Sequence, residues 1–138
     1  MPVTLTRTVG FRAVHRLYRP DWSEARNREA FGALSQPPGH AHDYRCAVTV
    51  GGPVDDRMAM VLDLAELDRI LQEEVVARLD GKHLNQDVPG LAGMVPTCEA
   101  IALDVFRRLR ARLPREVTLE RVRILEDPTL YADCTGLD

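Results

Sequence analysis

Residues 40–50 alternate between a largely apolar face and a polar face, a pattern that fits an extended strand with one buried side. The face expected to be buried carries His40, His42, Tyr44, Cys46, Val48 and Val50. Side chains two residues apart in a strand point the same way, so His40-Ala41-His42 aims two imidazoles at one place. The pattern predicts a strand that begins with a convergent pair of histidines.

Three further segments have the composition of strands: residues 3–17, 58–62 and 117–126. In the first, the apolar face runs from Val3 to His15, so a third histidine lies near one end of that strand. In the last, Val122, Ile124 and Glu126 share a face, so a carboxylate finishes an apolar row. We expect the segment 58–62 to return as a strand after the glycine-rich turn that precedes it.

Helical signals separate these strands. Residues 23–31 predict a short helix. Asp63 with Glu66 has the spacing of a helix start, and the apolar stripe that follows ends at Asp80-Gly81. After a loop over 83–96, Thr97 begins a second long helix that ends before Pro114. The order β, β, β, α, α, β predicts an α+β domain over residues 1–138, an antiparallel sheet of about four strands with two helices on one face.

Bulk properties exclude several classes of protein. The formal net charge of -3 provides no basic field for nucleic acid, and no apolar run approaches a membrane span. The first residues lack the apolar core of a secretory signal. Three cysteines at unrelated spacings indicate reduced thiols, so we expect a cytoplasmic protein. The open edges of the predicted sheet favour closure by self-association.

The histidines carry the main chemical hypothesis. His15, His40 and His42 on two neighbouring strands would form a facial tripod for Zn²⁺ with one open coordination position, as in catalytic zinc sites. The alternative is a set of strand-end histidines that hydrogen-bond within the core. The pattern His-x-His alone does not separate the two.

The chain resembles the 6-pyruvoyl-tetrahydropterin synthase and 6-carboxy-tetrahydropterin synthase family over nearly its whole length. Each matching motif is modest, but their joint order and spacing are specific. The matching segments are residues 11–17, 27–32, 39–44, 60–67, 79–80 with 84–85, 96–99, and Glu126.

The resemblance implies a tunnelling fold, with two helices inserted between the second and third main strands and subunits closed into an oligomeric barrel. It implies a homo-oligomer, trimer or hexamer, with active sites at subunit boundaries and 7,8-dihydroneopterin triphosphate as the substrate. By the same resemblance, His15, His40 and His42 are zinc ligands. Glu126 holds the guanidine-like edge of the pterin, and the turn at Thr97 and Cys98 contacts it.

Two departures from the family pattern affect proton transfer. The family's cysteine lies six residues before the first paired histidine, and that position here is Leu34, which cannot exchange a proton. The family's Asp-His dyad is also altered, since Asp80 is followed by Gly81 and a histidine comes only at His83. We expect Asp80 and His83 to replace the dyad, because an imidazole with a pKa of about 6.5 suits proton transfer.

Each of these residues also has an ordinary structural interpretation. His83 fits a solvated loop histidine, Thr97 a helix cap, Cys98 a buried small residue and Glu126 the start of a turn. We therefore weigh two functions. The first is a zinc-dependent pterin lyase with chemistry diverged by Leu34, including an aldol-type cleavage. The second is a catalytically silent paralogue that binds a pterin or a metal.

Overall fold

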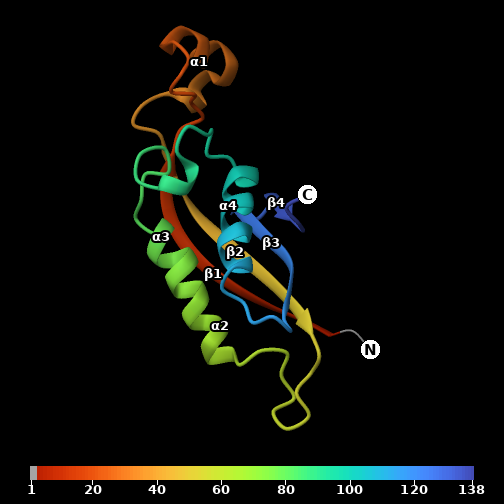
Figure 1. Cartoon of the computed structure of the whole chain (residues 1–138). Helices are drawn as coiled ribbons and strands as arrows, with labels where there is room; N and C mark the ends of the chain where they lie inside the picture. Colours follow the sequence, from red (N-terminus) through yellow and green to blue (C-terminus); the bar gives the residue numbers. More distant parts are fainter. Residues whose placement is uncertain (1–2) are drawn as a thin grey trace.

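The computed structural model describes residues 3–138, and within them four strands form one antiparallel sheet in the order β1-β2-β3-β4 (Figure 1). The strands are β1 (Val3–His15), β2 (His40–Gly52), β3 (Thr118–Asp127) and β4 (Leu130–Cys134). The helices are α1 (Glu24–Phe31), α2 (Leu64–Leu71), α3 (Ala77–Leu79) and α4 (Cys98–Arg110). The α+β class and the four-stranded antiparallel sheet are thus confirmed.

One predicted strand is wrong and one strand was missed. Residues 58–62 form no strand, because the carboxylate of Asp55 accepts the backbone N–H groups of Arg57 and Met58 at 2.8 Å and closes a turn instead. The fourth strand is β4, which pairs with β3 in a hairpin. The observed order is therefore β1, α1, β2, α2, α3, α4, β3, β4, and the two long helical segments, α2 with α3 and then α4, lie between the second and third strands as expected.

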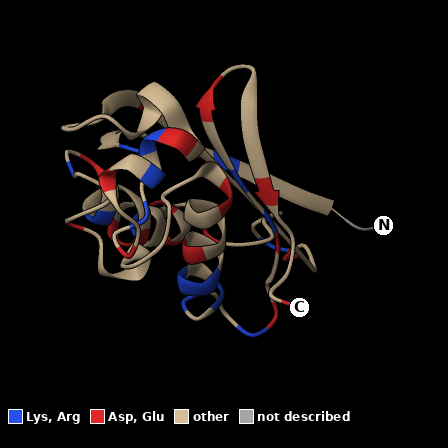
Figure 2. Cartoon of the chain, turned by 90° about the horizontal axis from the view of Figure 1, so that it is seen from above, with Lys and Arg blue, Asp and Glu red and all other residues tan. Residues whose placement is uncertain are grey.

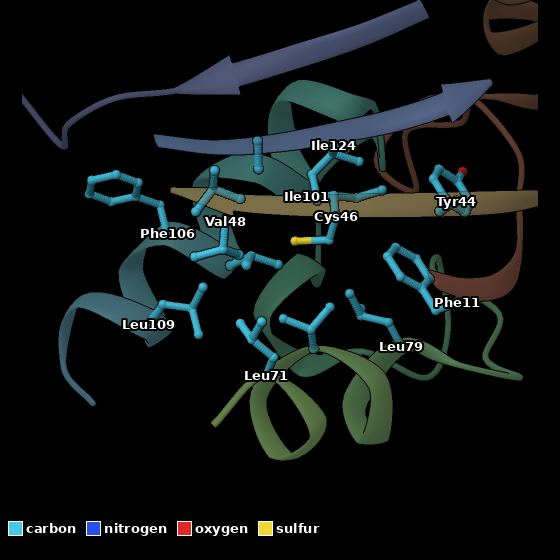
Figure 3. Packing of buried hydrophobic residues seen from close by; sticks show 14 of the residues in the cluster. Phe11, Tyr44, Cys46, Val48, Leu71, Leu79, Ile101, Phe106, Leu109 and Ile124 are labelled. Atoms are coloured by element: carbon cyan, nitrogen blue, oxygen red, sulfur yellow. The ribbon is translucent and has the colours of Figure 1, made fainter. Parts of the chain in front are cut away.

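The long helices pack on one face of the sheet and enclose the core (Figures 1 and 3). The predicted helix over 63–80 is α2 and α3 joined by one π-helical turn, Gln72–Val76. The predicted cap of α4 is present, since the hydroxyl of Thr97 accepts the N–H of Ala100 at 3.2 Å. Buried side chains that meet between the layers are Phe11, Tyr44, Cys46, Val48, Leu71, Leu79, Ile101, Phe106, Leu109 and Ile124.

A cluster of charges joins the two helical segments at the π-helical turn. The guanidinium of Arg108 donates to the backbone carbonyl of Glu74 and, at 2.8 Å, to the carboxylate of Asp104. Arg112 donates to the carboxylate of Glu74. Since Glu74 and Asp104 are buried, these pairs satisfy charges that would otherwise be costly.

Acidic and basic side chains are interspersed over the sheet and helices (Figure 2). Within residues 3–138, no helix has the length and apolar character needed to cross a membrane.

Candidate metal centre and its cavity

The pairing of β1 with β2 brings the three histidines together. His15 lies opposite His40 in the ladder, and His42 is two residues further along the same face of β2. One ligand nitrogen from each ring lies within 4.8 Å of the other two. The ring centroids are 4.6 Å apart for His15 and His40 and 5.0 Å for His40 and His42.

The close approach of the two strand ends depends on Gly39. Its φ of +112° lies in the region that favours glycine, and a Cβ at this position would lie 2.6 Å from the carbonyl oxygen of His15. A side chain here would therefore force apart the segments that carry His15 and His40.

The ring of His15 is only 1% exposed and is held by one hydrogen bond. Its Nδ1 lies 2.8 Å from the carbonyl oxygen of Pro96, which can only accept, so Nδ1 is the donor and Nε2 carries the lone pair of the neutral ring. The pKa values of His15 and His40 are both lowered, and burial is the largest cause for each ring. Neutral imidazoles are the form that binds a metal.

Two ring nitrogens at this site are left without partners. Among residues 3–138, neither Nε2 of His15 nor Nε2 of His42 has a hydrogen-bond partner, although both atoms are buried. The interpretation as core-bonded histidines therefore accounts for Nδ1 of His15 but not for these nitrogens.

Glu126 lies close to both unpartnered nitrogens. Its Oε1 is 3.4 Å from Nε2 of His15 and 3.8 Å from Nε2 of His42. At this distance a carboxylate oxygen and a nitrogen lone pair repel each other. A positive charge near the oxygen and the nitrogen, either a proton or a bound cation, would remove that repulsion. The three histidines could hold a metal ion, and their orphaned buried nitrogens fit that role.

The site opens into a cavity of about 390 Å³. Of the residues predicted to bind substrate, Thr97, Cys98 and Glu126 all line it. Burial, followed by the charge of Glu126, raises the pKa of the Cys98 thiol to about 11, so this thiol is protonated at neutral pH. The full lining is His15, Leu17, Leu34, His40, His42, Thr97, Cys98, Glu99, Glu126, Leu130, Tyr131 and Ala132.

Leu34 lies in the wall of this cavity and is 48% exposed. Its short 3-10 turn, Gly32–Ser35, is held to the segment just after β1, because the N–H of Leu17 donates to the carbonyl of Leu34 at 2.9 Å. An apolar side chain therefore stands beside the histidines, at the position for which the resemblance implies a cysteine.

Sequence reasoning did not identify Glu99 or the wall residues from β4, among them Tyr131. Glu99 directly follows Cys98 in a segment that matches the family pattern, so its position at the cavity could have been predicted from the sequence. Tyr131 was not, because it depends on the hairpin that the strand pattern did not reveal.

Asp80 and His83 lie elsewhere in the described chain and do not line this cavity. The carboxylate of Asp80 accepts the backbone N–H of Arg12 at 2.9 Å. Nε2 of His83 donates to the carbonyl of Pro38 at 2.7 Å. Both belong to a segment that runs along the outer edge of β1, where the N–H of Val14 donates to the carbonyl of Lys82 at 3.0 Å.

Residues 4–136 match the profile of a protein family described as 6-pyruvoyl tetrahydropterin synthase. The 6-pyruvoyl tetrahydrobiopterin synthase of Drosophila melanogaster is 39% identical over 124 residues, which cover 90% of this chain and 74% of that protein. The structure of the 6-pyruvoyl tetrahydropterin synthase of Caenorhabditis elegans superposes with a TM-score of 0.91 at 32% identity, covering 99% of this chain and 97% of the other. A dihydroneopterin monophosphate aldolase of Pyrococcus furiosus is 27% identical over 126 residues, 91% of each chain.

Proposed function

The chain belongs to the 6-pyruvoyl tetrahydropterin synthase family, and on that premise we propose that it is a zinc-dependent lyase acting on 7,8-dihydroneopterin triphosphate or a related pterin. The observation that carries this proposal is the convergence of three histidines and Glu126 in one cavity. We further propose that it works as one domain over residues 1–138, in the cytoplasm, as a homo-oligomer.

His15, His40 and His42 would hold the zinc. When bound, the metal supplies a Lewis acid that polarises a hydroxyl or carbonyl oxygen on the side chain of the substrate. The hydrogen bond from His15 to Pro96 fixes the tautomer and direction of one ring, as outer partners of metal ligands commonly do.

Glu126 would anchor the pterin. A carboxylate accepts two parallel N–H bonds from an aminopyrimidinone edge, and charge-assisted pairs of this kind give both affinity and orientation. The cavity volume of about 390 Å³ suits a small heterocyclic ligand. The turn at Thr97 and Cys98, on the same cavity wall, would contact the ring.

We assign proton transfer to Asp80 and His83, which would act on a substrate bound in the cavity of a neighbouring subunit. Both lie along the outer edge of β1 and away from the cavity of their own chain, which supports a role toward the cavity of a neighbouring subunit. Leu34 provides no proton-exchanging group, so we propose that the standard elimination of triphosphate is suppressed.

A second candidate is an aldol-type cleavage of the pterin side chain. The likeness to the Pyrococcus furiosus aldolase favours it, because that reaction also acts on a dihydroneopterin derivative. The other class of answer is a silent paralogue that binds a pterin or a metal without turnover.

Product analysis with the zinc-loaded protein separates these functions. We expect dihydroneopterin triphosphate to be consumed slowly. The main product should be a pterin whose side chain has been cleaved between two carbon atoms. Rapid formation of the 6-pyruvoyl or 6-carboxy product would contradict the proposed suppression. Binding of the pterin with no product would favour the silent paralogue, and absence of both zinc and pterin binding would overturn the proposal.

A further inference from the structure

The hydroxyl of Tyr44 is a buried polar group that the site described above does not use. Tyr44 lies on β2 two residues after His42, on the same face, and is 1% exposed. Its ring stacks on Phe11 with centroids 5.0 Å apart, and the rings of His15 and His42 lie edge-on at 5.9 and 5.6 Å. Figure 3 shows the tyrosine at the end of the core, beside Phe11.

This hydroxyl has no hydrogen-bond partner anywhere in residues 3–138. By contrast, the hydroxyl of the half-buried Tyr18 donates to Glu24 at 3.0 Å. Buried tyrosine hydroxyls usually find a partner, because leaving one unsatisfied costs free energy. A phenylalanine would keep the stack on Phe11 without that cost, so the oxygen requires another explanation.

Glu126 is the acceptor best placed to use this donor. The ladder between β2 and β3 ends where Arg45 pairs with Leu125, and continuing that register by one residue sets Tyr44 across from Glu126, on the face that carries the histidines. A carboxylate has about four acceptor directions. The directions that a ligand does not occupy are open to a second donor.

We propose that Tyr44 is a positioning residue for Glu126, with a hydroxyl that is unpaired in the free protein and donates to the carboxylate when Glu126 engages a pterin. This inference rests on the proposed function, since the pterin is the ligand proposed for Glu126. The hydroxyl then destabilises the free protein and strengthens binding. An ordinary structural tyrosine has the opposite effect on stability, because its hydrogen bond is formed in the free fold.

The test replaces the hydroxyl alone. Tyr44→Phe and the matched control Tyr18→Phe are compared with the unmodified protein for zinc content, thermal midpoint without metal or ligand, and affinity for neopterin by fluorescence titration. For Tyr44→Phe we expect an unchanged zinc content, a midpoint equal to or a few degrees above that of the unmodified protein, and about tenfold weaker binding. Tyr18→Phe should leave the affinity for neopterin unchanged.

A double variant tests the partner. In a Glu126→Ala background, we expect Tyr44→Phe to change the affinity by less than about twofold, because the acceptor that the hydroxyl serves is absent. Three results would overturn the inference: a lowered thermal midpoint for Tyr44→Phe, an affinity equal to that of the unmodified protein, or a full tenfold effect in the Glu126→Ala background. If the unmodified protein binds no neopterin while it holds zinc, the proposed pterin site fails, and this pairing fails with it.

Discussion

Nδ1 of His15 donates to the carbonyl oxygen of Pro96 at 2.8 Å, so the end of β1 is joined to the loop that leads into α4. The two walls of the cavity meet in this hydrogen bond, since His15 belongs to the sheet and Thr97 and Cys98 directly follow Pro96. The orientation of a candidate metal ligand and the position of the candidate pterin-binding turn are thus set by the same contact.

Replacing His15 should abolish metal binding. His15→Ala removes one of the three converging nitrogens, and two imidazoles hold zinc much more weakly than three. We expect the zinc content to fall from about one equivalent to below about 0.1, measured by elemental analysis after dialysis. His83→Ala is the matched control, since its ring bonds to Pro38 outside the cluster. Equal zinc loss in both variants would contradict the tripod.

Leu34→Cys should restore standard chemistry in part. A thiol at this place in the cavity wall returns a proton-exchanging group, and general acid–base catalysis contributes about 10²–10⁴-fold. We expect at least a tenfold faster formation of the 6-pyruvoyl or 6-carboxy product, measured by chromatography. Leu34→Ser provides a control of similar size without the thiol.

Adding Gly81→His to Leu34→Cys tests the second departure from the family pattern. Gly81 has a φ of +73°, so a histidine there is strained, and we expect some loss of stability along with any gain in rate. A rate no higher than that of Leu34→Cys alone would indicate that His83 already fills the role of the missing histidine.

Subunits with different defects should complement one another. Asp80→Asn should lower kcat by about 100-fold, and His15→Ala should inactivate through loss of metal. If Asp80 serves the cavity of a neighbour, oligomers reassembled from a mixture of the two variants should contain some intact sites. We expect the mixture to recover activity that neither variant shows alone. Mass spectrometry should verify that mixed oligomers have formed. If they show no recovered activity, Asp80 and the three histidines act in the cavity of the same subunit.

Removing Arg108 should destabilise the fold without touching the site. Arg108→Met leaves the buried carboxylates of Glu74 and Asp104 short of a partner and the carbonyl in the π-helical turn without its donor. We expect a loss of about 3 kcal/mol in the free energy of unfolding, measured by urea denaturation. Arg107→Met, on the exposed side of the same helix, should change it by less than about 0.5 kcal/mol.

The same cluster should make stability depend on acid pH. Burial alone would raise the pKa of Glu74, but the hydrogen bond from Arg112 and the charges of Arg78 and Arg108 lower it overall from its usual 4.5. A group with a lowered folded-state pKa stabilises the fold above its unfolded pKa and loses that contribution as the pH falls through the folded value. We expect the free energy of unfolding to drop below about pH 4.5, and to drop less in Glu74→Gln. Glu29→Gln, on an exposed part of α1, should follow the unmodified protein.

The sequence predicted the elements whose pattern is local and repeated. The alternation of β2 located His40 and His42, and the register with β1 that brings His15 beside them follows from simple antiparallel pairing. The cap at Thr97 is read from a single polar residue at a helix start, and its side chain accepts the N–H of Ala100 as expected.

Other features depend on contacts that no short pattern encodes. The apolar run at 58–62 resembles a strand, yet the Asp55 turn and the positive φ of Ala59 direct the chain otherwise. The strand β4 is short, and its pairing with β3 includes a register shift between Leu125 and Asp127, so its alternation is weak. The absence of Asp80 from the cavity lining depends on the path of the chain after α3, which periodicity does not determine.

The absence of a Cβ atom at Gly39 affects metal binding by the neighbouring histidines. Only a hydrogen fits where the backbone passes the carbonyl of His15, so even alanine would act as a wedge between the two segments. Such a wedge would leave the buried layers largely untouched while widening the gap among the imidazoles. A folded protein could therefore lose its capacity to capture a cation through the smallest substitution available, at a residue that never touches the ion.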